Sequence, residues 1–208
     1  MKHPIDISQW KRREHFAFYK DFDEPFHSVT VHLDCTRAYQ RARDTQQSFF
    51  LTYLHAILRA ANATEALRYR LEDEQVVVYD TIHAGPTVGR ADHTFGFCRV
   101  HYQEDFNGFA QRARADMGRV KAASGLCMHE TAGQNDLLYM SVLPGIRFTS
   151  LTNAQMFGKS AGIPKITLGQ CTEAGGRMHM PMAVFVHHAL VDGYDLEQFI
   201  AQTEALLA

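Results

Sequence analysis

The 208-residue sequence has little of what would set it apart from ordinary globular proteins. Its four cysteines, Cys35, Cys98, Cys127 and Cys171, are widely spaced and include no CxxC pair. That spacing argues for reduced, mostly buried thiols rather than a disulfide framework or a zinc site. Stretches rich in proline, glycine or serine are missing as well, so no linker divides the chain. We therefore expect a single domain over residues 1–208.

The sequence also lacks an excess of charge of one sign and any long apolar run. Lys and Arg total 21 against 23 Asp and Glu, a formal net charge of -2. This balance predicts neither a nucleic-acid nor a membrane partner. The longest apolar run near the carboxyl end, 180–186, has the length of a strand, and the first residues contain no apolar core of signal-peptide length. We expect a cytoplasmic protein whose partner is a small molecule or another protein.

What is present is the composition of a folded domain. Hydrophobic residues make up 46% of the chain and charged residues 21%, close to the average for globular proteins, which argues against disorder, collagen and a bare coiled coil. A chain of this length buries roughly two-thirds of the surface that its unfolded form exposes. Stability therefore requires no disulfide or metal.

Hydrophobic periodicity predicts an α+β domain in which helices pack on a large mixed sheet. Apolar residues recur at helical spacing in three segments, and β-branched or apolar runs of strand length occur in seven. The predicted helices are 45–63, 104–123 and 192–207, and the predicted strands are 27–33, 74–79, 94–102, 137–142, 146–151, 165–171 and 178–186.

The most informative segment lies between the last predicted strand and the last predicted helix, where residues 187–193 read HHALVDG. An apolar strand delivers two imidazoles, and Asp192 follows His188 by four residues. A histidine fixed there could take a proton from a hydroxyl or thiol, because its reference pKa lies near 6.5. The same pattern also fits a core histidine followed by a helix cap, so spacing alone leaves both interpretations open.

The HHALVDG segment resembles the signature of the chloramphenicol acetyltransferases, whose relatives include the acyltransferase core of 2-oxo-acid dehydrogenase complexes. Further segments resemble that family in the same order along the chain, from about residue 5 to residue 200, so we expect the whole chain to share its fold. These segments are Ile5–Trp10, Arg12–Phe16, Ser141–Pro144, Phe148–Ser150, Pro164–Thr167 and Met180–Pro181.

The resemblance implies a catalytic role for five residues. His188 would be the general base that deprotonates the acceptor hydroxyl as its oxygen attacks the thioester of acetyl-CoA. Asp192 would pair with Arg12 and hold the shape of the site. Ser150 would donate a hydrogen bond to the oxyanion of the tetrahedral intermediate, and Thr167 would assist through a bound water. Taken alone, Ser150 and Thr167 could be ordinary strand residues, and Arg12 a surface charge.

The resemblance also implies an acceptor site and an assembly. Phe18, Tyr19, Thr87 and Phe95 match positions that contact the acceptor in the family. Core packing is the alternative for Phe18 and Phe95, since phenylalanine is often buried for no other reason. The family implies acetyl-CoA as co-substrate, no metal, and a homotrimer in which His188 of one chain faces a pocket of its neighbour. Clefts between subunits are common sites for small ligands.

The sequence departs from the family pattern around the expected acceptor and coenzyme walls. Residues 152–162 replace an Asn-rich stretch and are poorer in aromatics. Gln170 and Cys171 replace a Lys-Tyr pair whose tyrosine lies against the adenine in family members. Phe50 replaces a tyrosine that lines the pantetheine tunnel in the family. Gly145 follows Pro144 where the family has tryptophan. None of these changes alters the proton-transfer residues.

Three functions follow from these observations. The first is an acetyl-CoA-dependent O-acetyltransferase that acetylates chloramphenicol by direct attack on the thioester. The second keeps the same chemistry but uses another hydroxylated acceptor, which the altered segment 152–162 favours. The third is a trimeric binding module without catalytic activity. Retention of His188, Asp192, Arg12 and Ser150 together argues against the third.

Overall fold

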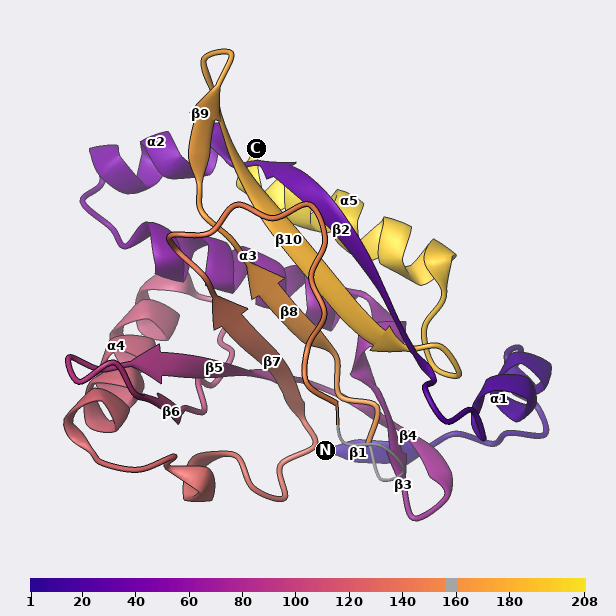
Figure 1. The fold of residues 1–208 in the computed structure, drawn as a ribbon. Coiled ribbons are helices and arrows are strands. Elements are labelled where there is room, and N and C mark those ends of the chain that lie inside the picture. Colours follow the sequence, from indigo (N-terminus) through magenta and orange to yellow (C-terminus); the bar gives the residue numbers. More distant parts are fainter. Residues whose placement is uncertain (156–160) are drawn as a thin grey trace.

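The computed structural model describes residues 1–155 and 161–208 and has the mixed α+β architecture predicted from the sequence. Figure 1 shows a large twisted sheet with helices α2, α3 and α5 behind it, and the short helix α1 set off to one side. The helices are α1 (Arg13–Tyr19), α2 (Thr36–Asp44), α3 (Phe49–Ala63), α4 (Phe106–Ala122) and α5 (Gly193–Leu207), with 3-10 turns at Glu65–Arg68 and Met128–Glu130.

The strands form a large sheet and a small one. The large sheet has the order β2-β10-β8-β7-β5-β6, with β9 paired to β10, and the small sheet has the order β1-β4-β3. Strands β5, β7 and β8 run parallel, whereas β10 is antiparallel to both β2 and β8. The strands are β1 (Lys2–Pro4), β2 (Phe26–Asp34), β3 (Tyr69–Glu72), β4 (Gln75–Tyr79), β5 (His83–Gly89), β6 (Phe95–Phe97), β7 (Leu137–Val142), β8 (Lys165–Leu168), β9 (Thr172–Ala174) and β10 (Arg177–His187).

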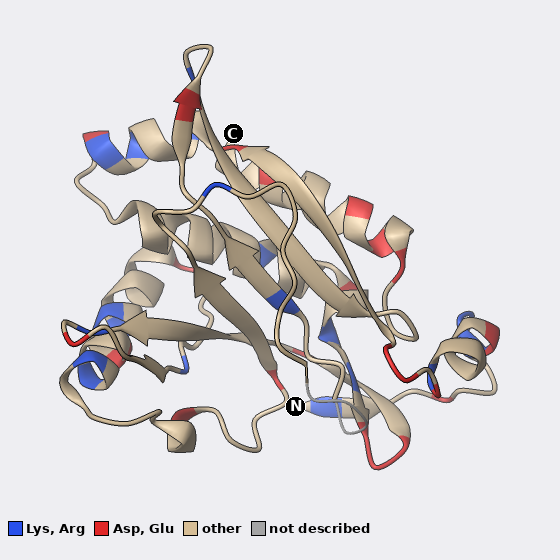
Figure 2. Cartoon of the chain, in the orientation of Figure 1, with Lys and Arg blue, Asp and Glu red and all other residues tan. Residues whose placement is uncertain are grey.

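The hydrophobic core lies between the large sheet and the helices. Side chains alternate across a strand, so Ile166 and Leu168 of β8 face the core and are at most 1% exposed. Helix α3 begins at the Ser48 cap, whose side chain accepts a hydrogen bond from the Leu51 N–H. The charged positions in Figure 2 lie mainly on α2, α4, α5 and the loops, and the central strands are almost uncharged. Parallel strands that are covered on both faces consist mainly of uncharged residues, as the central strands do here.

Most predicted elements are confirmed, with shifted ends. The helices expected at 45–63, 104–123 and 192–207 are α3, α4 and α5, and the strand expected at 137–142 is β7. The prediction for 94–102 is only partly right, because β6 covers three residues and Val100 adds an isolated bridge to Ala84.

The strand predicted at 146–151 is wrong. Those residues lie in the connection between β7 and β8, which Figure 1 shows crossing the face of the sheet away from α3 and α5. The connection lies close against the sheet at Gly169, where an added Cβ would stand 2.7 Å from the backbone oxygen of Ile146. The Gln170 N–H donates a hydrogen bond to the same oxygen at 2.7 Å. Phe148 of this segment lies against Gly169 as well, so the connection covers the sheet here instead of joining it. Of the altered segment 152–162, residues 156–160 lie outside the described part of the chain.

Candidate active site

The histidine pair follows directly from strand β10. His187 is the last strand residue, only 3% exposed, and its Nδ1 accepts a hydrogen bond from the Ala189 N–H at 3.3 Å. Burial, with a smaller contribution from the neighbouring His188, lowers the pKa of His187 to about 4. His187 is therefore a neutral structural residue, and His188 is the imidazole available for chemistry.

The ring of His188 lies between two other rings. The Tyr19 ring stacks on it with centroids 4.0 Å apart and planes inclined by 16°, and the His27 ring stacks at 4.1 Å and 29°. Two rings stacked this closely on one imidazole must occupy its opposite faces, because they would otherwise collide. Nδ1 of His188 is buried and has no hydrogen-bond partner within the described residues. Among the described residues, the contacts that orient this ring are the two stacked rings.

Arg12 and Asp192 brace the loop that carries His188. The Arg12 guanidinium donates a hydrogen bond to an Asp192 carboxylate oxygen, and its other nitrogen lies 3.3 Å from the backbone oxygen of His188. Asp192 also caps α5 by accepting the Tyr194 N–H at 3.0 Å, while Asp195 accepts the Asp192 N–H. Burial works to raise the pKa of Asp192, but the hydrogen bond and charge of Arg12 outweigh it and hold the pKa below its ordinary value.

A groove leads away from His188 between β2 and α5. Its volume is about 620 Å³, and His27 lies in it together with His188. The walls are largely apolar, formed by alternate residues of β2 and one side of α5, with two glutamates at the rim. The remaining lining residues are Val29, Val31, Gly193, Leu196, Glu197, Ile200, Ala201 and Glu204.

The predicted oxyanion donors lie on the other face of the sheet. Thr167 of β8 is 3% exposed and alternates with the core residues Ile166 and Leu168, so its side chain points away from the helices. Its hydroxyl lies 3.4 Å from the side-chain amide of Asn153 in the β7–β8 connection. Ser150 is exposed in the same connection. Within one chain, these residues and His188 are on opposite sides of the sheet.

The predicted acceptor residues divide into two groups. Phe18 is 63% exposed at the end of α1, and its ring contacts that of Tyr19 beside His188. Thr87 and Phe95 lie on β5 and β6, where Thr87 pairs with Phe97 and Phe95 is 45% exposed. Strands β10 and β6 are four strand spacings apart, roughly 19 Å. One chain therefore brings together Tyr19, Phe18 and His188, but not Thr87 and Phe95.

Two residues are predicted to contact the coenzyme: Phe50 in the first turn of helix α3, and Gln170 just after strand β8. Phe50 is half-buried, and its ring packs edge-on against Tyr53 at 5.4 Å. Gln170 follows β8 and is half-buried. No described contact joins the two, so their role in coenzyme binding remains a prediction.

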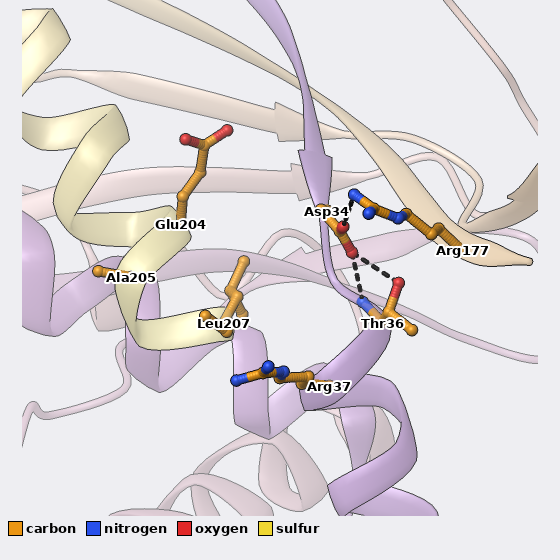
Figure 3. A pocket seen from close by; sticks show the side chains of 8 residues that line it. Asp34, Thr36, Arg37, Arg177, Glu204, Ala205 and Leu207 are labelled. Atoms are coloured by element: carbon orange, nitrogen blue, oxygen red, sulfur yellow. Dashed lines mark hydrogen bonds and ion pairs between the residues drawn. The ribbon is translucent and has the colours of Figure 1, made fainter.

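A second groove, of about 590 Å³, lies at the other end of the β2–β10 pair (Figure 3). Asp34, the last residue of β2, accepts hydrogen bonds from Thr36 and forms an ion pair with Arg177 at 3.4 Å. Its charge is thus already balanced, and Figure 3 places Glu204 and Leu207 of α5 on the facing wall. None of the predicted site residues lines this groove. Among the described residues, no group of three or more His, Cys, Asp or Glu side chains is arranged to hold a metal ion.

Comparison with known proteins decides the family. The family model for chloramphenicol acetyltransferase matches residues 2–204. A solved structure named chloramphenicol acetyltransferase is similar over 100% of both chains, with a TM-score of 0.94 and 36% identity. The chain belongs to the chloramphenicol acetyltransferase family. Family, fold class and the acyltransferase class of enzyme were all predicted correctly from the sequence.

More distant relatives agree with this assignment. A chloramphenicol acetyltransferase of Escherichia coli is 28% identical over 203 residues, 96% of this chain and 91% of the relative. One from Streptomyces acrimycini is 28% identical over 207 residues, 99% of this chain and 94% of the relative. The cubic core of a pyruvate dehydrogenase multienzyme complex shares the fold, with a TM-score of 0.66 at 17% identity over 88% of this chain and 82% of that chain. Among the described residues of this chain, no helix is both long enough and apolar enough to cross a membrane.

Sequence reasoning missed two aromatic residues of the site. His27 lies on β2 in contact with His188, and Phe22 is 45% exposed and packs against Phe18 and Tyr19. The only signal in the sequence was that His27 alternates with Val29, Val31 and Leu33 on one face of a strand. Periodicity places such a histidine near the core but cannot say which ring it meets.

Proposed function

We propose that this member of the chloramphenicol acetyltransferase family transfers the acetyl group of acetyl-CoA to a hydroxyl of chloramphenicol, with His188 as general base. The observation that carries the proposal is the fixed imidazole of His188, stacked between Tyr19 and His27 and backed by the Arg12–Asp192 pair. A base held in one orientation contributes more to the rate than a mobile one, because its geometry is set before the substrate arrives.

The chemistry is a direct acyl transfer. His188 takes the proton of the acceptor hydroxyl as the hydroxyl oxygen bonds to the thioester carbon, and a tetrahedral oxyanion forms. Ser150, assisted by Thr167 through a bound water, stabilises that oxyanion, which is usually among the largest contributions to acyl transfer. The carbon–sulfur bond then breaks, and the imidazolium returns its proton to the departing thiolate. Asp192 takes no proton in any of these steps. Through its pair with Arg12 it holds the loop that carries His188.

The two groups of site residues support a homotrimer with active sites between subunits. His188 faces the groove on the helix side of the sheet, whereas Thr167 and the β7–β8 connection lie on the other face. Thr87 and Phe95 lie several strands away. A complete site with all these residues therefore requires two copies of the chain, His188 coming from one and the oxyanion donors from the other.

We assign acetyl-CoA as the co-substrate and the cytoplasm as the compartment. Phe50 and Gln170 are the residues that we assign to coenzyme contact. Cys35 and Cys171 are free thiols with sulfur atoms 3.4 Å apart, a state that persists in the reducing cytoplasm, where we place the enzyme.

Release of free thiol from acetyl-CoA tests the activity. We expect release with chloramphenicol by the natural sequence, and loss of nearly all turnover in His188→Ala without loss of folding. The matched control is His32→Ala, which removes an exposed histidine from β2. Release only with other alcohols would replace chloramphenicol by another acceptor, and absence of release with any alcohol would favour the binding module. Comparable turnover by His188→Ala would contradict the assignment of the base.

Mixed assemblies test the shared site. We expect a mass of three times the 23.6 kDa chain in solution. Co-expression of His188→Ala chains with Ser150→Ala chains should restore part of the activity, because some interfaces then combine an intact His188 with an intact Ser150. Absence of recovery would mean that both residues act from the same chain.

A further inference from the structure

The function of His27 follows from its contact with His188. Its ring lies 4.1 Å from that of His188, on the face opposite Tyr19. Its Nε2 lies 3.3 Å from the backbone oxygen of Val191. A carbonyl oxygen only accepts hydrogen bonds, so Nε2 of His27 carries the proton, and the ring is fixed in one tautomer.

We propose that His27 is a positioning residue for acyl transfer, a ring that holds the imidazole of His188 in the plane needed to deprotonate the acceptor. The proposal rests on the proposed function of His188 and assigns a role to His27, which takes no part in the proton transfer of that mechanism. Without His27, one face of the His188 ring borders the open groove, and only Tyr19 limits its rotation.

Three observations support a positioning role over simple core packing. Nδ1 of His188 has no hydrogen-bond partner within the described residues, whereas two rings stack on the imidazole, one of them that of His27. His27 is half-buried at the groove, not enclosed in the core. Its ring Nε2 donates a hydrogen bond to the backbone oxygen of Val191, in the loop between His188 and the Asp192 cap, and this bond fixes the His27 ring relative to the loop that carries His188.

The surroundings of His27 keep it uncharged. Burial lowers its pKa, and positive charge on His188 or Arg12 acts in the same direction, against the Val191 carbonyl and Asp192. From α5, the carboxylates of Glu197 and Glu204 line the same groove. When His188 becomes an imidazolium during transfer, a neutral ring beside it causes no charge repulsion, whereas two cations 4 Å apart would repel strongly.

Two substitutions separate stacking from hydrogen bonding. His27→Phe keeps a flat ring against His188 but removes the donor to Val191. His27→Gln keeps an amide donor that can reach Val191 but removes the ring. His32→Phe is the matched control, since it makes the same change at an exposed position of the same strand.

We expect His27→Gln to lower kcat by about a hundredfold, the loss typical of a displacement of about 1 Å at the reacting centre. The KM values for acetyl-CoA and chloramphenicol should change little, and His27→Phe should restore most of the rate. The ring protons of His188 provide a readout that does not depend on activity. In nuclear magnetic resonance spectra they should shift downfield in His27→Gln, because one stacked ring is lost, and stay near their original position in His27→Phe.

The outcomes distinguish this proposal from the proposed function. If the natural sequence does not acetylate any alcohol, the proposed function fails, but the spectra still test the stacking. If it is active and His27→Gln keeps its kcat, the positioning role is wrong. A rate restored by Gln but not by Phe would assign the role to the Val191 hydrogen bond and overturn the proposal, as would equal losses in both variants.

Discussion

Replacing Asp192 by Asn should destabilise the protein through loss of one charge. Asn can still cap α5, because its side-chain oxygen can accept the Tyr194 N–H that Asp192 now accepts at 3.0 Å. What is lost is the ion pair with Arg12, whose side chain is 15% exposed against 31% for Asp192. Breaking a buried pair costs about 3–5 kcal/mol, and breaking an exposed one about 0–1 kcal/mol.

The partly buried Arg12–Asp192 pair lies between those limits, and a second carboxylate reduces the loss. Asp195 is 3.7 Å from Arg12 and can partly replace the missing charge. We therefore expect a loss of about 1–2 kcal/mol in the free energy of unfolding, or roughly 2–8 °C in Tm for a chain of this length. Turnover should fall as well, since Arg12 also contacts the backbone oxygen of His188.

Urea and thermal unfolding measured by circular dichroism will test this value, with Asp34→Asn as the matched control. Like Asp192, Asp34 accepts a hydrogen bond from the backbone N–H two residues later, that of Thr36, at 3.0 Å. Its ion pair with Arg177, however, is exposed. Equal losses in the two variants would refute the reasoning.

The loss in Asp192→Asn should also depend on pH. Because the folded pKa of Asp192 lies below its ordinary value of 3.8, the contribution is complete above that value and disappears as the pH falls through the folded pKa.

Three further predictions follow from the site and the core. Ser150→Ala should lower kcat by about a hundredfold with little change in stability, measured by thiol release and thermal unfolding; an unchanged kcat would exclude it as an oxyanion donor. Acidification from about pH 7 to about pH 4 should destabilise the fold, because buried His187 and half-buried His83 have pKa values of about 4 and the unfolded chain binds protons first, near 6.5. Each histidine should lower the free energy of unfolding by an amount of order 3 kcal/mol over this range. A urea midpoint that does not change between these pH values would contradict the lowered pKa values of the two histidines. Alkylation of the native protein, followed by mass spectrometry, should modify half-buried Cys171 before Cys35, which is 0% exposed and has its thiol pKa raised by burial; the reverse order would place Cys35 at the surface.

The elements predicted best are those whose periodicity and burial agree. Strand β7 has the predicted ends, and α3, α4 and α5 appear where one face of each segment is apolar. Helices α1 and α2 were not predicted: α1 has only seven residues, and α2 is largely polar, with only Ala38 and Ala42 buried. The connection at 146–151 was mistaken for a strand, because apolar residues that cover a sheet have the same composition as residues that join one.

The sequence by itself determined the family and the α+β class and predicted His188 as the base, because HHALVDG and the accompanying segments are local patterns that a chain carries before it folds. Only the tertiary structure decided which rings enclose that base. The contact of His27 with His188 joins residues 161 positions apart, and it depends on the register of β2 against β10, which pairs His27 with Val186. The separation of Ser150, Thr167 and Phe95 from His188 within one chain could not be derived from periodicity or spacing, because strand order and the face of a sheet are set by long-range pairing.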